Sequence, residues 1–218
     1  MIIKIYNLFK IIRKFSVSGA VNVLDEIKPM PKFLKFIFYI FSFGSNKDLK
    51  LLNKTPGEKL CTALQEMGTT FIKLGQFLAT RPDIIGDDVA KKLENLQDKL
   101  PAFSTLEAKE MLKREIGQKS FEKIISLNNP AAAASIAQVH FAKILIEGQE
   151  KEIAIKILRP NIHKTVNEEL DALMFVAYMV ESLFKKTKRL KLVEVIYLLK
   201  EITNVEMDLR FEAAAASE

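Results

Sequence analysis

Residues 131–158 read AAAASIAQVHFAKILIEGQEKEIAIKIL, and this stretch decides the fold. Two segments with strand patterns lie at 136–144 and 153–158, and Gly148 sits in the polar connector between them, which is typical of a hairpin. The small side chains that precede the hairpin predict a loop; they are Ala131, Ala132, Ala133, Ala134 and Ser135. The stretch therefore predicts an antiparallel pair of strands behind a small-residue loop.

Lys156 occupies a distinctive place in the second strand. Alternation with a period of two puts Ile153, Ile155 and Ile157 on one face of the strand and Lys156 on the other. One face can therefore pack while the other accepts a ligand. A loop of small residues next to one lysine can bring backbone amides and a cation to nucleotide phosphates, as in a kinase-type ATP site. An ordinary half-buried hairpin with a snorkelling lysine shows the same pattern, so this segment alone leaves both interpretations open.

The sequence on both sides of the hairpin has helical periodicity. Two long helices are predicted at 166–185 and 190–216, joined by a basic connector. Before the hairpin, helices are predicted at 55–80, 86–100 and 104–116; Pro82, Pro101 and Gly117 end them. The first begins at Thr55-Pro56-Gly57-Glu58, a capping signal. The predicted fold class is α+β, mostly helical, with a short antiparallel sheet.

Two sets of polar residues lie on the predicted helices. Lys73 and Gln76 are three residues apart in Lys73-Leu74-Gly75-Gln76, so they share a helix face. On a single helix over 190–216, Asp208 and Glu212 lie about 40° apart and Glu206 about 120° from Glu212, so that helix can serve two lysines. On a plain solvated helix, the same acids would instead pair locally with Lys200 or Arg210.

Four stretches occur together and in a particular order: Lys73-Leu74-Gly75-Gln76, AAASIAQVH at 132–140, Ile153-Ala154-Ile155-Lys156, and Glu206-Met207-Asp208 with Glu212. In this combination the chain, from about Pro56 to its last residue, resembles the UbiB family of atypical kinase-like proteins. The resemblance implies a helical N-terminal extension and an incomplete protein-kinase-like N-lobe. The predicted parts are a basic, aromatic-rich arm (1–54), a helical Lys-x-Gly-Gln subdomain (55–120) and a truncated N-lobe (121–218).

The resemblance also implies roles for individual residues. Lys156 is expected to contact the phosphates of ATP or ADP, with Glu212 as its ion-pair partner and Ala131, Ala132, Ala133, Ala134 and Ser135 in place of a glycine-rich loop. Lys73 and Gln76 are expected to face Glu206 and Asp208 in a regulatory contact. That contact would exclude protein substrates and leave ATP hydrolysis or a small lipid-like substrate.

The family's catalytic part has no counterpart in this sequence. It contains no Asp-Phe-Gly and no His-x-Asp, so this polypeptide alone is expected to be inactive. We expect Mg²⁺ only with a missing C-terminal lobe, which the same gene or a split gene would supply. Other implied partners are proteins of ubiquinone biosynthesis. The alternative is a non-catalytic adaptor, or gene remnant, that associates with a membrane or a prenyl lipid.

Positive charge is concentrated in the arm. Of 33 Lys and Arg residues, ten lie in residues 1–54 against three of the 27 acids, which leaves 23 bases and 24 acids in the rest of the chain. Seven of the 15 phenylalanines lie between Phe9 and Phe43. This pattern favours the surface of an anionic membrane, and the aromatic run is too short to span one. We expect a peripheral, intracellular location at a bacterial or organellar inner membrane. Alternatively, these helices dock on the body of the protein through Phe and Ile.

Other function classes lack support in the sequence. One cysteine, Cys61, cannot form an intrachain disulfide or a metal-binding cysteine cluster, which fits a reducing compartment. His140 and His163 lack metal-ligand spacing and are interpreted as packing or surface residues. No metal site is predicted, and no recognised motif supports nucleic-acid binding.

Overall fold

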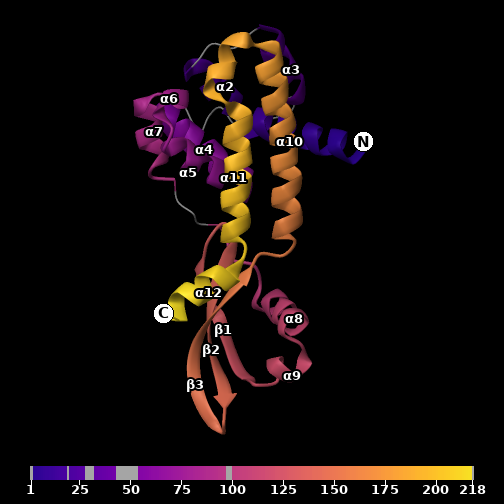
Figure 1. Ribbon diagram of the computed structural model, residues 1–218, viewed down its shortest axis with the longest axis vertical. Helices are drawn as coiled ribbons and strands as arrows, with labels where there is room; N and C mark the ends of the chain where they lie inside the picture. Colours follow the sequence, from indigo (N-terminus) through magenta and orange to yellow (C-terminus); the bar gives the residue numbers. More distant parts are fainter. Residues whose placement is uncertain (1, 19, 28–31, 43–53, 97–99, 218) are drawn as a thin grey trace. The chain divides into compact units, whose positions relative to one another are not determined.

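The computed structural model describes residues 2–18, 20–27, 32–42, 54–96 and 100–217. They form two compact units: unit 1 comprises Met1–Gln97 with His163–Glu218, and unit 2 comprises Asp98–Ile162 (Figure 1). The predicted α+β, mostly helical class with a short antiparallel sheet is confirmed. The compact units differ from the predicted divisions. The stretch of chain just before the sheet belongs with the sheet to unit 2, whereas the stretch after the sheet belongs with the N-terminal helices to unit 1.

Unit 2 is built around the predicted hairpin. Strands β2 (Ala137–Ile146) and β3 (Gln149–Leu158) pair antiparallel in unbroken register from Ala137 opposite Leu158 to Ile146 opposite Gln149. Glu147 and Gly148 form the turn with φ of 50° and 78°, the left-handed region that Gly adopts readily. Gly148 therefore has its predicted place.

The position of the third strand was not predicted. Strand β1 (Ile124–Ala133) pairs antiparallel with β2, so the sheet order is β1-β2-β3. Its sequence includes Asn128-Asn129-Pro130, which favours a turn, and the register with β2 shifts on both sides of Pro130. The loop prediction for Ala131, Ala132 and Ala133 was therefore wrong, because these residues continue β1. Only Ala134 and Ser135 remain in the turn, which the Ala134 N–H closes by donating to the Ala137 carbonyl at 2.8 Å.

One face of the sheet packs on a helix. Helix α8 (Thr105–Ile116) begins at the predicted cap, where the Ser104 hydroxyl accepts from the Glu107 N–H, and ends before Gly117. The short α9 (Gln118–Phe121) follows. Buried Ala108 and Leu112 contact Ile157, and Ile155 packs against this cluster. The aliphatic face of β3 is thus the packed face, as the alternation predicts.

Four helices before the sheet belong to unit 1. They are α4 (Pro56–Met67), α5 (Thr69–Ala79), α6 (Pro82–Ile85) and α7 (Asp87–Leu93). The predicted single helix over 55–80 is divided at Gly68, whose φ is 98°. That conformation cannot continue a helix, so the single-helix prediction was wrong there. The predicted helix at 86–100 is the shorter α7.

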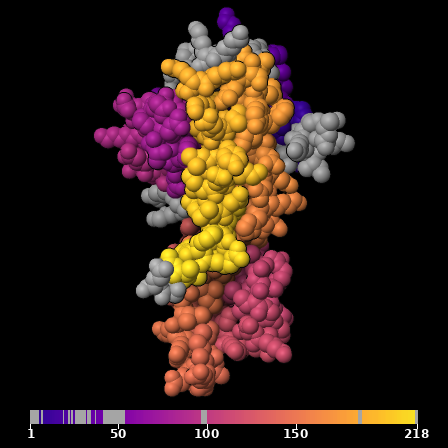
Figure 2. Space-filling model, in the orientation of Figure 1, coloured from indigo at the N-terminus to yellow at the C-terminus, as the bar shows by residue number. Residues whose placement is uncertain are grey.

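Two long helices after the sheet also belong to unit 1. Helix α10 (Ile162–Leu183) is joined by the 3₁₀ turn η2 (Lys185–Leu190) to α11 (Leu192–Glu206), and α12 (Leu209–Ser217) follows. Lys200 on α11 forms an ion pair with Asp171 on α10 at 2.7 Å, and Figure 2 shows α10 and α11 side by side at the surface. The predicted helix 190–216 is interrupted at Met207 and Asp208. Glu206 and Glu212 therefore lie on different helices, and the one-helix angles predicted between them were wrong.

The described part of the arm consists of α1 (Ile2–Ser18), α2 (Ala20–Ile27) and α3 (Lys32–Ser42). Ile11, Ala20 and Val23 are buried, and the Phe15 ring packs edge-on against Phe71 of α5 with centroids 5.4 Å apart. Lys14 forms an ion pair with Glu169 of α10. Helices α1 and α2 therefore dock on the body of the protein, which is the alternative given for the arm. Residues 43–53 of the predicted arm lie outside the described residues.

Helix α3 keeps an exposed apolar surface. Phe36, Tyr39 and Ile40 are exposed, with 64%, 69% and 55% of their surface accessible. Across the described residues, none of the helices combines the length and the apolar character needed to span a bilayer. In the described part of the arm, α1 also exposes large apolar side chains, at Tyr6 and Phe9.

The N-terminus of α4 predicts a pH dependence of stability. Thr55 and Glu58 form the predicted capping box, and the Lys92 ammonium lies 3.1 Å from Glu58. Hydrogen bonds, first from the Thr55 N–H and then from Lys92, lower the pKa of Glu58 from 4.5 to about 2. Because the folded-state pKa is lower than the unfolded one, this stabilisation is present above pH 4.5 and is lost as the pH falls towards 2.

We therefore expect Glu58→Gln to lower the melting temperature at neutral pH, with a difference from wild type that shrinks between pH 4.5 and pH 2. Thermal unfolding followed by circular dichroism across this range measures it. Glu94→Gln, at another exposed carboxylate of unit 1, is the matched control. A difference that stays constant over this range would contradict the capping role.

Candidate functional site

The second face of the unit 2 sheet carries Lys156. In the register of β2 and β3, Val139 lies opposite Lys156 and Phe141 opposite Ala154, and these four residues point away from the Ile155 and Ile157 face. Phe141 is 57% exposed, and Val139 and Lys156 are half-buried. The sheet thus presents a cation and an aromatic ring on the face that α8 does not cover.

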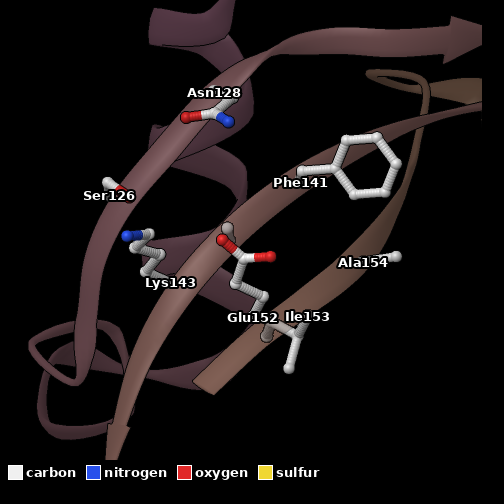
Figure 3. A pocket seen from close by; sticks show the side chains of 8 residues that line it. Ser126, Asn128, Phe141, Lys143, Glu152, Ile153 and Ala154 are labelled. Atoms are coloured by element: carbon white, nitrogen blue, oxygen red, sulfur yellow. The ribbon is translucent and has the colours of Figure 1, made fainter. Parts of the chain in front are cut away.

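A cavity with a volume of about 390 Å³ lies in this part of the sheet. Six of its lining residues are Ser126, Asn128, Phe141, Lys143, Glu152 and Ala154 (Figure 3). Lys143 lies opposite Glu152 in the register, and the Lys143 ammonium is 3.8 Å from Glu150. Because Ala154 lies two residues before Lys156 on the same strand face, the cavity borders the position of that lysine.

The alanine-rich segment Ala131–Ser135 comprises the end of β1 and part of the turn that leads into β2. Ala131 and Ala132 are exposed, Ala133 and Ala134 are half-buried, and Ser135 is fully buried. Neither the hydroxyl nor the backbone of Ser135 therefore faces solvent. The exposed alanines carry no side chain beyond Cβ, and a ligand can approach the backbone closely.

Two buried polar side chains of β2 beside this segment bond to the backbone of Phe103 and of β1. Gln138 is 1% exposed; it accepts a hydrogen bond from the Phe103 N–H and donates to the Phe103 carbonyl. Its amide also donates to His140 Nε2 at 2.8 Å, and His140 Nδ1 lies 2.7 Å from the Asn128 carbonyl. A carbonyl only accepts, so the His140 proton is on Nδ1 and Nε2 accepts. His140 is thus a packing residue, as predicted.

Lys73 and Glu206 form a contact within unit 1. Lys73 Nζ on α5 lies 2.8 Å from Glu206 Oε2 at the end of α11, with side-chain exposures of 13% and 37%. Among the described residues no hydrogen bond of good geometry reaches this oxygen, so the attraction is mainly Coulombic. The structure thus brings these two predicted residues together, and their regulatory role stays a prediction.

Gly75 allows α5 to approach its neighbours. A Cβ atom at this position would lie 2.5 Å from Leu96 Cδ2 and 2.7 Å from Leu64 Cδ1, and both leucines are buried. The glycine of Lys73-Leu74-Gly75-Gln76 is therefore required for packing, and the packing fixes the face of α5 that carries Lys73.

Asp208 pairs within its own segment. The Arg210 guanidinium donates to both carboxylate oxygens of Asp208, and the Arg210 N–H donates to one of them. This pairing lowers the pKa of Asp208 to about 2. For Asp208 the structure therefore shows the local pairing with Arg210 that is expected on a solvated helix. Gln76 is half-buried, and within the described interactions its amide bonds to neither acid.

Glu212 lies on α12 in unit 1 and is exposed, whereas Lys156 lies in unit 2. The pairing of these residues stays a prediction. In the part of the chain that the structure describes, no group of three or more His, Cys, Asp or Glu side chains could hold a metal ion.

Sequence reasoning missed Phe141, Asn128 and Arg159 as residues of this region. The strand alternation could have revealed Phe141, because it has the same parity on β2 as Val139. Arg159 has no such signal: its guanidinium bonds to backbone carbonyls, which every residue carries.

Comparisons with known proteins agree on one family. A family model described as the ABC1 atypical kinase-like domain matches residues 95–218. The "Probable protein kinase UbiB" of Histophilus somni (strain 129Pt) is 39% identical over 217 residues, which cover 97% of this chain and 39% of the relative. The protein with the same name in Marinobacter nauticus (strain ATCC 700491 / DSM 11845 / VT8) is 35% identical over 199 residues, covering 89% and 35%. The chain therefore spans less than two-fifths of the length of these relatives.

Proposed function

The chain belongs to the UbiB family of ABC1 atypical kinase-like proteins, and from this premise we propose that it supplies the nucleotide-binding part of an ATP-dependent kinase or ATPase in ubiquinone biosynthesis. One observation carries the proposal: β3 packs its isoleucine face on α8 and presents Ala154 and Lys156 on the other face, beside a cavity. An ammonium next to a cavity that is lined by both an aromatic ring and polar side chains fits a ligand with a flat ring and phosphates.

The residues of unit 2 fit the two ends of a nucleotide. The Phe141 ring and Ala154 line the cavity, where they offer apolar contact to a base. Lys156 and the backbone of the alanine-rich segment serve the phosphates. Glu212 orients the Lys156 ammonium in this proposal, as the family resemblance implies. ATP, when bound, supplies the phosphoryl group, and the residues of this chain bind and orient it.

We propose that Mg²⁺ binds to a part outside this chain. The described residues gather no group of three or more His, Cys, Asp or Glu side chains that could hold a metal ion. We propose that a C-terminal lobe, from the same gene or a second one, carries the catalytic loop and the metal aspartate. The greater length of the two relatives supports this division.

The Lys73–Glu206 pair has a regulatory role in this proposal. It ties α5 to α11 through two oppositely charged groups that are only partly accessible to water. We infer that it holds the Lys-x-Gly-Gln helix in the place that excludes protein substrates, which leaves ATP hydrolysis or a small lipid-like substrate.

Reconstitution tests the function. The chain is mixed with the segment of the longer relatives that follows the matched region, and ATP hydrolysis is measured with and without Mg²⁺. The proposal expects hydrolysis only when both polypeptides and Mg²⁺ are present. A mixture that binds no ATP and hydrolyses none would contradict it and favour a non-catalytic adaptor for a membrane or a prenyl lipid.

We further propose that α3 contacts the surface of an inner membrane. Replacing Phe36, Tyr39 and Ile40 by serine removes mainly exposed apolar area, so the free energy of unfolding should change little, while sedimentation with vesicles of phosphatidylglycerol should fall severalfold. Serine at exposed Leu106 of α8 in unit 2 is the control. Undiminished sedimentation of the triple variant would remove the membrane role of α3.

A further inference from the structure

The turn between α10 and α11 concentrates positive charge at one end of unit 1 (Figure 1). From Glu181 to Glu194 the intervening chain has no acidic residue and five basic ones, which are Lys185, Lys186, Lys188, Arg189 and Lys191. We call residues 185–191 the basic turn. Without its five bases, residues 55–218 carry 18 bases and 24 acids, so the basic turn is a local positive site in an otherwise acidic part of the chain.

Two charges of the basic turn are available to an external anion. Lys188 and Arg189 are exposed, and among the described residues no carboxylate forms an ion pair with either of them. The nearest acids in the sequence have other partners: Glu181 accepts from a backbone N–H of α11 at 3.1 Å, and Glu194 pairs with Lys191 at 2.9 Å. The proposed nucleotide site in unit 2 uses none of these residues.

Hydrogen bonds hold the conformation of the basic turn. The Thr187 hydroxyl donates to the Phe184 carbonyl at 2.7 Å, near the end of α10. Lys191 adopts the left-handed conformation, with φ of 50° and ψ of 48°, and its N–H donates to the Lys188 carbonyl at 3.1 Å. Because the backbone is already ordered, a ligand of Lys188 and Arg189 has little backbone entropy to overcome.

Exposed aliphatic side chains lie directly before the basic turn. Leu183 is 61% exposed and Met179 is 44% exposed, and their spacing of four residues puts them on one face of the last turns of α10. The surface of an anionic bilayer offers phosphates to lysine and arginine and hydrocarbon to leucine and methionine within a short depth. A nucleic acid or an acidic protein surface matches the charges but not these aliphatic side chains.

We propose that the basic turn binds the surface of a bilayer that contains anionic phospholipids. Lys188 and Arg189 contact the headgroup phosphates, and Leu183 enters the boundary between headgroups and acyl chains. This contact goes beyond the proposed role of α3, because it lies outside the arm and depends on the charge of the headgroups. It does not depend on nucleotide binding.

Sedimentation of the full chain with vesicles of phosphatidylcholine, with and without phosphatidylglycerol, tests the charged part of the contact. Each basic residue near an anionic surface contributes about a fivefold factor, so Lys188→Gln with Arg189→Gln should lower the partition coefficient about 25-fold. Lys113→Gln with Arg114→Gln is the matched control, because it removes an adjacent lysine and arginine from exposed positions on α8 of unit 2. The control is expected to change the partition by less than about twofold.

A serine variant tests the apolar part of the contact. Leu183→Ser should lower the partition severalfold, whereas Leu106→Ser, at an exposed leucine of α8, should not. All four variants replace exposed side chains, and melting temperatures that match wild type show that a lower partition does not come from unfolding.

The outcomes separate this inference from the proposal for α3. Equal losses from the Lys188–Arg189 variant and its control, or equal partition of wild type into vesicles with and without phosphatidylglycerol, would overturn the inference. So would a wild type that binds duplex DNA or polyglutamate but no vesicles. A loss in the α3 serine variant with none in the Lys188–Arg189 variant contradicts this inference alone, and the reverse result contradicts only the role of α3.

Discussion

Replacing Lys156 by alanine is expected to weaken ADP binding by about ten- to a hundredfold. A hydrogen bond to a charged group contributes about 1.5–3 kcal/mol, and removal of the ammonium also removes the Coulombic attraction to the phosphates. Lys156 points from the face of β3 that α8 does not cover, so the substitution leaves the core of Ala108, Leu112 and Ile157 intact. Titration with ADP measures the change, and melting temperature reports on folding.

Two further variants make this prediction specific. Lys151→Ala removes an exposed lysine of the same strand that has the opposite parity, and it is expected to leave ADP affinity unchanged. Lys156→Arg keeps the charge and is expected to retain part of the affinity, because guanidinium also binds phosphate but with a different reach. Equal losses from Lys151→Ala and Lys156→Ala would show that only net charge matters, contrary to the assigned role.

The contact between Lys73 and Glu206 is expected to give the largest change in stability. A double-mutant cycle with Lys73→Met and Glu206→Gln should measure a coupling energy of about 1–3 kcal/mol, as for other contacting pairs. Each single replacement should destabilise the fold, because it leaves a partly buried charge without the opposite charge that lies 2.8 Å away. Chemical denaturation followed by circular dichroism gives the four free energies of unfolding.

The exposed pair Lys191–Glu194 is the control for this cycle. Its nitrogen–oxygen distance is 2.9 Å, nearly the same, but the side chains are 63% and 68% exposed. Water screens such pairs, so a coupling of about 0–0.5 kcal/mol is expected. Equal coupling energies in the two cycles would show that burial does not strengthen the Lys73–Glu206 pair. That result would contradict the proposed role of the pair in holding α5 against α11.

Local signals predicted the hairpin and several helix ends correctly. Gly148 marks the turn because few other residues adopt its backbone conformation at low cost, and Thr55 and Ser104 cap helices because their hydroxyls accept from free N–H groups. The two faces of β3 followed from alternation alone. Each of these features depends on residues close together in sequence.

Features that depend on distant partners were missed or misjudged. Asn128-Asn129-Pro130 favours a turn locally, but pairing with β2 extends β1 through it, with register shifts on both sides. A helix over 190–216 satisfies local periodicity, yet the chain breaks at Met207 and Asp208, where Asp208 bonds to Arg210 instead of continuing the helix. In these cases strand pairing and side-chain hydrogen bonds outweighed the local conformational preference of the sequence.

The candidate site was accessible from sequence only in part. The family resemblance, not periodicity, indicated Lys73 and Glu206, which lie far apart in the chain and meet between α5 and α11. The burial of Ser135 depends on the tertiary structure around it. The hydrogen bonds from Arg159 to the Ala134 carbonyl depend on where that carbonyl points, and no residue type encodes that direction.

Amide chemical-shift mapping of the isotope-labelled chain during titration with ADP tests the central claim most directly. We predict saturable shifts in the amides of residues 131–135 and 154–156, on the face of the unit 2 sheet that α8 leaves open. Shifts confined to unit 1, or a spectrum unchanged at saturating ADP, would contradict the claim that this sheet binds the nucleotide.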